Sequence, residues 1–325
     1  MSSLFSRQFF TPKRVTTHEL PEAPGVSSDP TGVAWTWGYG DDRSQSRYVF
    51  YDESIVIAVN VALATGRPML VRGPSGSGKS TLARVIAVEL GRRYYEKTLT
   101  SKSQAQDLLW DVDHLRRLHD AQAAAGRART TSLPIHPYIT PGVLWWAFNP
   151  RSAARHGGDG SATIADPGQV GEAFADEGAV VLLDEIDKAE PDLPNGLLVA
   201  LGSYRFRVDP LDELVERVGP PPLVLITSND ERSLSPAFLR RCIRLTLTFP
   251  DASALREVAR LHVPNADPTI IEDLLEVIVP AGDNSQVSPA EFVDAVRAAV
   301  GLQARPGTAA WDRMLAVLRA PEGVG

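Results

Sequence analysis

The sequence predicts an α/β fold, in which a parallel β-sheet with flanking helices precedes a small all-α domain. Three observations predict it. Short apolar runs alternate with segments of helical periodicity between residues 52 and 247, which is the pattern of strands joined by crossover helices. A glycine-rich loop, residues 73–80, separates the first of these runs from the helical segment after it. Beyond Pro250 only amphipathic helical patterns remain.

Composition and charge fit a folded globular protein. The 325 residues are 43% hydrophobic, which is enough to fill a large core. The net charge of −7 supplies no general attraction to nucleic acid or to anionic membranes, so neither is an expected partner. A single cysteine, Cys242, excludes an internal disulfide and cysteine-based zinc sites, and this fits a reducing cytoplasm.

No membrane or export segment is visible. The longest apolar stretch, residues 55–64, is interrupted by Asn60 and is about half of the ~20 residues that a spanning helix needs. The N-terminal residues lack an apolar segment followed by a cleavage site. We therefore expect a cytoplasmic protein without a membrane segment.

Residues 1–46 are rich in Pro, Ser, Thr and Gly and predict an irregular N-terminal arm. We expect its aromatic side chains to dock on the same subunit or on a neighbour, because a solvated segment gains nothing from them. They are Phe9, Phe10, Trp35, Trp37 and Tyr39.

The sheet is expected in the next segment, an α/β domain over residues 47–250. A helix over 52–64 ends at Thr65–Pro68, because Gly and Pro terminate helices. The strands are expected at 69–71, 94–99, 179–183, 223–227 and 243–247, and the helices between them at 80–90, 104–124 and 191–201.

An insert near 104–171 interrupts this domain, because this connection is longer than a crossover needs. This insert is expected to hold a long charged helix over 107–125, an apolar helix over 141–148 and a Gly/Asp/Ser loop over 151–171. Trp145 and Trp146 of the apolar helix either bind a partner or pack the helix against the sheet.

The last part of the chain, residues 251–325, is expected to be a helical lid domain. Pro, Asp or Ser residues precede each of its helical patterns, as is typical of helix starts. These patterns cover 251–263, 268–278, 289–301 and 309–319.

The glycine-rich loop matches the pattern G-x-x-x-x-G-K-[ST] between a strand and a helix. Backbone N–H groups of such a loop bind nucleotide phosphates, while Lys79 reaches the β/γ oxygens and the Ser80 hydroxyl ligates Mg²⁺. The motif predicts binding of ATP or GTP; the alternative is a glycine turn without a ligand. The candidate binding residues are Gly73, Pro74, Ser75, Gly76, Ser77, Gly78, Lys79, Ser80 and Thr81.

Two acids follow the apolar run at 180–183. A buried parallel strand delivers its carboxyl end toward the phosphate loop, where a metal-associated carboxylate is needed. We expect Asp184 to hold Mg²⁺ through its water shell and Glu185 to polarise the attacking water as general base. The alternative is a strand that ends in a solvated acidic turn.

A further apolar strand ends at Asn229, which would orient the attacking water if this strand lies beside the acidic one. An arginine pair, Arg240 and Arg241, follows eleven and twelve residues later. Guanidinium groups bind phosphate oxygens bidentately and stabilise the charge of a transferring phosphoryl group. We expect the pair to act on the nucleotide of a neighbouring subunit.

These motifs together resemble those of an AAA+ ATPase over about residues 47–320. The resemblance rests on Gly73–Ser80, Leu182–Glu185, Thr227–Asn229 and Phe238–Cys242, followed by the helical domain. It implies hydrolysis of ATP with Mg²⁺ between the subunits of a ring, with six subunits as the expected number. It also implies that Asn229 is sensor 1 and that Arg241 is the trans arginine finger, with Arg240 as its neighbour or substitute.

The insert near 104–171 and a second one, near 204–222, resemble the two inserts of the MoxR-like branch of that superfamily. This resemblance implies a chaperone-like machine that remodels a protein client, with a von Willebrand factor A-type protein as the implied partner. One position departs from the family pattern: Ala290 occupies the slot of the sensor 2 arginine. Either another basic residue such as Arg297 takes that role, or the sensor is absent.

Two functions from different classes therefore stay open. The first is a remodelling motor, and the second is an ATP-dependent assembly switch with slow hydrolysis that controls an effector in a bacterial regulatory or defence module. A DNA-processing motor is disfavoured by the acidic charge. A small-molecule kinase would leave Glu185, Asn229 and the arginine pair without a role.

Overall fold

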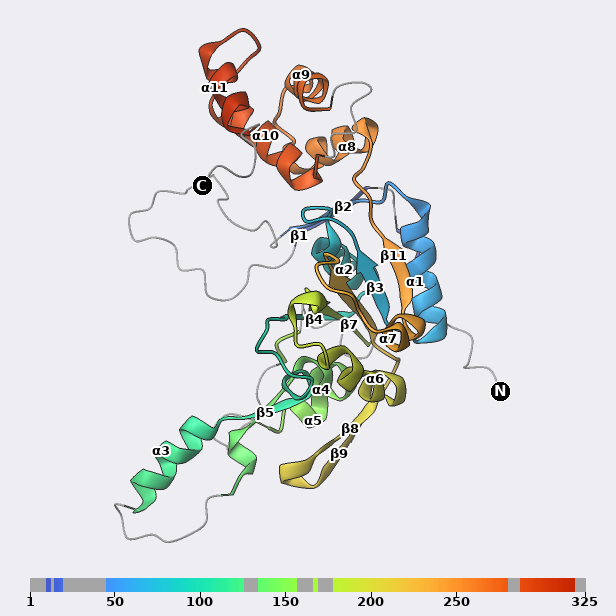
Figure 1. Cartoon of the computed structure of the whole chain (residues 1–325), viewed down its shortest axis with the longest axis vertical. Helices are drawn as coiled ribbons and strands as arrows, with labels where there is room; N and C mark the ends of the chain where they lie inside the picture. The colour runs from blue at the N-terminus through green and yellow to red at the C-terminus, as the bar shows by residue number, and fades with distance from the viewer. Residues whose placement is uncertain are drawn as a thin grey trace. The chain divides into compact units, whose positions relative to one another are not determined.

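The computed structural model describes residues 10–12, 15–19, 45–125, 134–156, 166–168, 178–279 and 287–318 (Figure 1). The chain divides into two compact units. Unit 1 comprises residues 1–11, 54–72 and 86–245, and it holds the main sheet. Unit 2 comprises residues 12–53, 73–85 and 246–325, and it holds the phosphate loop and the C-terminal helices.

The main sheet has five strands in the order β11-β3-β10-β7-β4. Strand β10 pairs in parallel with β3 and with β7, and β7 pairs in parallel with β4. Every residue of β7 and of β10 is buried, as expected of central strands covered on both faces. The strands are β3 (Met69–Arg72), β4 (Arg93–Thr98), β7 (Ala179–Asp184), β10 (Leu223–Ser228) and β11 (Ile243–Thr246). The predicted parallel α/β sheet is thereby confirmed.

Three helices near the strands lie close to the predicted positions. Helix α1 (Glu53–Thr65) precedes β3, whereas α2 (Lys79–Glu89) and α6 (Leu193–Ser203) lie between strands. A short helix, α7 (Pro236–Arg241), also lies between strands and was not predicted. Glycine at position 66 has a φ of 68° and ends α1, as the sequence indicates.

The first insert differs from its prediction. Instead of one helix over 107–125, a short 3-10 helix (Gln106–Leu108) and strand β5 (Trp110–Val112) precede a shorter helix, α3 (His114–Ala125). The carboxylate of Asp113 accepts the N–H of Arg116 at 2.8 Å and so starts α3 after the strand. Strand β5 pairs antiparallel with β6 (Ile139–Pro141), which follows a second 3-10 helix (His136–Tyr138).

The apolar segment of this insert forms two short helices, α4 (Val143–Phe148) and α5 (Pro150–Ala153). Trp145 and Trp146 are buried in the core of unit 1, with exposed fractions of 0% and 4%. Their side chains therefore pack the protein interior and present no binding surface. Only part of the predicted loop at 151–171 lies within the described residues.

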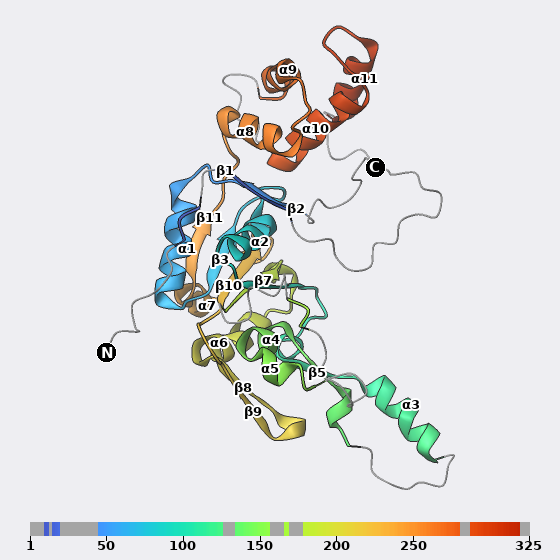
Figure 2. The same ribbon diagram turned by 180° about the vertical axis from the view of Figure 1, so that it is seen from behind.

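The second insert is a β-hairpin. Its strands are β8 (Arg205–Val208) and β9 (Glu213–Glu216), which pair antiparallel and form a separate two-stranded sheet (Figure 2). The inward side chains of Phe206, Val208 and Val215 belong to the core of unit 1. The hairpin begins directly after Tyr204, which lies in the left-handed region with a φ of 52° and ends α6.

Unit 2 contains four C-terminal helices close to their predicted positions: α8 (Ala252–His262), α9 (Pro268–Ile278), α10 (Pro289–Gly301) and α11 (Ala309–Leu318). Their apolar faces bury one core, which includes Leu274, Phe292 and Trp311. Asp251, Asp267 and Ser288 cap the first three helices by accepting backbone N–H groups.

The described part of the N-terminal arm is more regular than predicted. Strands β1 (Val15–Glu19) and β2 (Gln45–Val49) pair antiparallel. Phe10 is 1% exposed, and its backbone N–H and C=O bond the amide side chain of Asn60 in α1 at 2.8 and 2.9 Å. The docking of Phe10 on its own subunit is thus confirmed, whereas Phe9, Trp35, Trp37 and Tyr39 lie outside the described residues. Within the described part of the chain, no helix is long and apolar enough to span a bilayer.

Candidate functional site

The phosphate loop joins the end of β3 to the start of α2. Gly76 and Gly78 have φ values of 75° and 86°, a region that side chains other than glycine rarely adopt. A Cβ atom at Gly76 would lie 2.8 Å from the hydroxyl of Ser288, and one at Gly78 would lie 3.2 Å from the ring of Tyr48. Both glycines are therefore required by the backbone and by the close neighbours of the loop.

Lys79 begins α2 and is 8% exposed. Its ammonium group donates hydrogen bonds to the carbonyls of Gly73 and Pro74, each at 2.8 Å, so it lies over the start of the loop. The hydroxyl of Ser77 is buried without a hydrogen-bond partner among the described residues. A buried cation, an unpartnered hydroxyl and a glycine-lined backbone fit an anionic ligand such as a nucleotide phosphate.

The remaining polar residues of the loop motif differ in their exposure. Ser75 is exposed at the tip of the loop, whereas Ser80 and Thr81 are half-buried in the first turn of α2. Ser80 follows Lys79 directly in the sequence, and this is the position at which the motif has the hydroxyl that ligates the metal. The position of Mg²⁺ itself stays a prediction.

The start of α10 contacts the same loop. Ser288 caps α10 in a capping box with Glu291, and Ala290 would lie 3.4 Å from a Cβ at Gly76. Ala290, which stands in the sequence slot of the sensor 2 arginine, therefore lies beside the phosphate loop. Arg297 lies seven residues further along the helix, about 10 Å along its axis, and its guanidinium pairs with Asp294 at 3.7 Å.

Tyr48 of β2 was not predicted as part of the site. Its ring lies against Gly78 and 5.0 Å from the ring of Phe50, and its hydroxyl is buried without a partner among the described residues. Burial raises the pKa of this hydroxyl well above its ordinary value, and Tyr51 and Asp52 add to the effect. Tyr48 thus acts as an uncharged aromatic wall of the loop.

In unit 1, the acids lie at the carboxyl end of β7. Asp184 is 5% exposed, and its carboxylate accepts a hydrogen bond from the hydroxyl of Thr227 in β10. The same hydroxyl accepts the backbone N–H of Glu185 at 2.9 Å. Thr227 is fully buried and so ties both acids to the neighbouring strand. Sequence reasoning placed Thr227 in a motif but gave it no role.

Glu185 leaves the strand in a left-handed conformation, with a φ of 62°. Its carboxylate pairs with the ammonium of Lys188 at 2.7 Å. This hydrogen bond is the main reason that the pKa of Lys188 is raised, so Lys188 carries its charge at neutral pH. Lys188 was also missed, because its contact with Glu185 depends on the turn that follows β7.

Asn229 comes directly after β10, the strand that lies between β3 and β7. The buried carboxylate of Asp187 accepts the backbone N–H groups of Asn229 and Glu231, at 3.2 and 3.0 Å. Asp187 therefore fixes the turn that carries Asn229. Because β3, β10 and β7 are parallel, Arg72, Ser228 and Asp184 all end strands at the same edge of the sheet.

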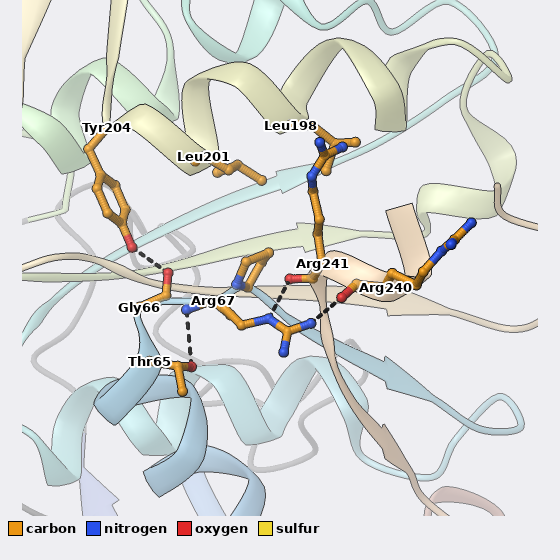
Figure 3. A pocket seen from close by; sticks show the side chains of 10 residues that line it. Thr65, Gly66, Arg67, Leu198, Leu201, Tyr204, Arg240 and Arg241 are labelled. Carbon is orange, nitrogen blue, oxygen red and sulfur yellow. Dashed lines mark hydrogen bonds between the residues drawn. The ribbon is translucent and has the colours of Figure 1, made fainter. Parts of the chain in front are cut away.

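The arginine pair ends α7. Ser235 caps the start of this helix by accepting the N–H of Phe238 at 3.2 Å. Both arginines are exposed. The guanidinium of Arg240 turns back to the carbonyl of Pro236 at 3.2 Å, whereas the side chain of Arg241 runs toward Leu198 (Figure 3).

Comparison with known protein families matches residues 68–242 to the AAA domain of the dynein-related subfamily. Among solved structures, RuvB of Thermotoga maritima, a Holliday junction branch migration motor, is 16% identical with a TM-score of 0.45. The match covers 82% of this chain and 67% of that one. A point variant of the same protein gives a TM-score of 0.47 at 16% identity, over 82% and 68% of the two chains. The family match spans more than half of the 325 residues, and the chain therefore belongs to the AAA domain family, in its dynein-related subfamily.

Proposed function

We propose that the protein hydrolyses ATP at one site that combines the phosphate loop with the acids at the end of β7. The observation that carries the proposal is the strand order. Strand β3 runs directly into the phosphate loop, and it reaches the same sheet edge as the strand that ends in Asp184. The buried Lys79, and the buried Ser77 hydroxyl that has no partner among the residues the structure describes, support the binding of phosphate by the loop.

The residues of this chain then have separate roles. When bound, Mg·ATP supplies the phosphoryl group and the metal that neutralises its charge. The loop N–H groups and Lys79 hold the phosphates, while Ser80 and Asp184 hold the metal. Glu185 accepts the proton of the attacking water, and Asn229 orients that water. Lys188 holds Glu185 in place through the ion pair between the two side chains.

We further propose that the site is completed across a subunit interface of a ring, which we expect to be hexameric. Arg241, with Arg240 beside it, is exposed and therefore available to a nucleotide on a neighbouring subunit. The two inserts support assignment to the MoxR-like branch, in which the machine remodels a protein client together with a von Willebrand factor A-type partner.

A second candidate function is the ATP-dependent assembly switch, and one observation favours it. Ala290 lies at the phosphate loop where a sensor 2 arginine would act, so the lid supplies no arginine at that point. Client-stimulated hydrolysis would identify the motor. Nucleotide-dependent assembly with negligible turnover would identify the switch.

The proposal is tested by measuring ATP binding and hydrolysis for two variants. Lys79→Ala should lose ATP binding, because the loop loses its cation while its backbone stays intact. Glu185→Gln should bind ATP but hydrolyse it ~10²–10⁴-fold more slowly, because it lacks the general base. Glu190→Gln removes an exposed acid five residues away and is the matched control. Unchanged ATP affinity in Lys79→Ala, or unchanged turnover in Glu185→Gln, would refute the site.

A further inference from the structure

Arg67, which sequence analysis gave no role, lies against the end of the arginine-bearing helix. Its guanidinium donates hydrogen bonds to the carbonyls of Arg240 and of Arg241, the latter at 3.1 Å (Figure 3). It also donates to the carbonyl of Cys242 at 3.3 Å. The last carbonyls of a helix lack partners within the helix, and an arginine near the C-terminus supplies them. Arg67 is thus a cap for α7 that is supplied by another part of the chain.

The same segment also fixes the strand that follows α7. The carbonyl of Pro68 accepts the backbone N–H of Ile243 at 2.8 Å, at the start of β11. Arg67 and Pro68 therefore hold the chain on both sides of Cys242. The backbone direction at Arg240 and Arg241 decides where their side chains leave the surface, and both side chains are exposed.

The segment that carries Arg67 is itself held in place. The hydroxyl of Tyr204, at the end of α6, donates a hydrogen bond to the carbonyl of Gly66. Gly66 has a φ of 68°, which favours glycine, and a Cβ there would lie 2.7 Å from this hydroxyl. The guanidinium of Arg217 lies over the ring of Tyr204, 5.3 Å from its centroid. The cap is therefore built on a fixed turn.

We propose that Arg67 is a positioning residue for the arginine finger: it orients Arg241, and with it Arg240, toward the nucleotide of the neighbouring subunit. This inference rests on the proposed function, because it requires that the arginine pair acts in trans. Arg67 is itself exposed, so its loss should leave the fold and the ATP pocket of its own subunit intact.

The first test measures ATP binding, assembly and hydrolysis for Arg67→Met, which keeps most of the side-chain volume but removes the donors. We expect normal ATP binding and assembly, with hydrolysis reduced ~10–100-fold, since a misplacement of about 1 Å has an effect of that size. Arg67→Lys should recover part of the activity, because an ammonium group can bond helix carbonyls. Arg260→Met, which removes an exposed arginine 3.9 Å from its nearest carboxylate, is the control.

The second test mixes subunits in co-expressed assemblies that are purified through two different tags. An Arg67→Met subunit has an intact pocket, so pairing it with Lys79→Ala subunits, which keep the finger, should restore activity. Pairing Arg67→Met with Arg241→Ala should restore nothing, because both lack a functional finger. If Arg67 only stabilised the fold of its own subunit, the two pairs of variants would not differ in this way.

The outcomes separate the two proposals. The inference is overturned if Arg67→Met hydrolyses ATP like the wild type, loses ATP binding, fails to assemble, or regains activity with Arg241→Ala subunits. If Arg241→Ala keeps full hydrolysis, the arginine pair is no finger, and the trans part of the proposed function fails together with this inference; if Arg241→Ala loses hydrolysis while Arg67→Met keeps it, only this inference fails. In either case Arg67→Met activity matches Arg260→Met activity.

Discussion

Thr227→Val removes the one hydroxyl that joins both acids to β10 and keeps the shape of the side chain. The variant loses a hydrogen bond to the Asp184 carboxylate and leaves the N–H of Glu185 without its acceptor. A hydrogen bond to a charged group contributes about 1.5–3 kcal/mol, and an unsatisfied buried N–H costs about 1–3 kcal/mol. Because Thr227 is fully buried, we expect the free energy of unfolding to fall by about 2–5 kcal/mol.

The same substitution should affect the metal. Loss of the group that orients a metal-binding carboxylate typically weakens metal binding ~10–100-fold. The Mg²⁺ concentration for half-maximal ATP hydrolysis should therefore rise by that factor. Urea unfolding measures the first effect, and Mg²⁺ titration of hydrolysis measures the second.

Two variants serve as controls for Thr227→Val. Thr227→Ser keeps the hydroxyl and should keep the Mg²⁺ dependence of the wild type. Ser228→Ala removes the neighbouring buried hydroxyl, which bonds the N–H of Asp230 at 3.0 Å and neither acid. The reasoning is refuted if Thr227→Val requires no more Mg²⁺ than Ser228→Ala.

Two further predictions concern the loop and the cysteine. Gly76→Ala should lose ATP binding and lower the free energy of unfolding by at least ~1 kcal/mol, because a φ of 75° is strained for alanine and the new Cβ would contact Ser288. Equilibrium ATP binding and urea unfolding measure the two effects. Wild-type ATP affinity in this variant would contradict the constraint on the loop. Burial raises the pKa of the Cys242 thiol from 9.0 to about 11. The contribution of the buried, protonated thiol to the free energy of unfolding is therefore fully present below pH 9 and is lost as the pH rises through 11. At pH 8 a thiol-specific chromogenic reagent should therefore label the folded protein far more slowly than the urea-unfolded protein, and equal rates would contradict the burial.

The sequence was sufficient to predict the central strands and the C-terminal helices, because the residues of both follow local patterns. Strands β7 and β10 are continuous apolar runs, and α10 begins with the Ser288 cap. The helix expected over 107–125 was wrong for a nonlocal reason. Residues 110–112 pair with a strand almost thirty residues later, and no local periodicity reveals that pairing.

The residues of the candidate site also divide into those that a local motif predicts and those that it does not. The phosphate-loop residues and the two acids stand in contiguous motifs and were predicted residue by residue. Thr227, Tyr48 and Arg67 were not, because each acts on a segment far away in the sequence: Thr227 on β7, Tyr48 on the phosphate loop, Arg67 on α7. Their hydroxyl, ring and guanidinium gain their roles only from the fold.

The central claim is that Asp184 serves the nucleotide held by the phosphate loop. Its most direct test is the binding of a fluorescent ATP analogue to wild type and to Asp184→Asn, each with Mg²⁺ and with a chelator. Asp192→Asn, which alters an exposed acid that makes no capping hydrogen bond, is the control. We predict equal affinity in the chelator and a loss of ~10-fold or more of the strengthening by Mg²⁺ in Asp184→Asn alone. If Mg²⁺ strengthens binding equally in all three proteins, the loop and the acids do not form one site.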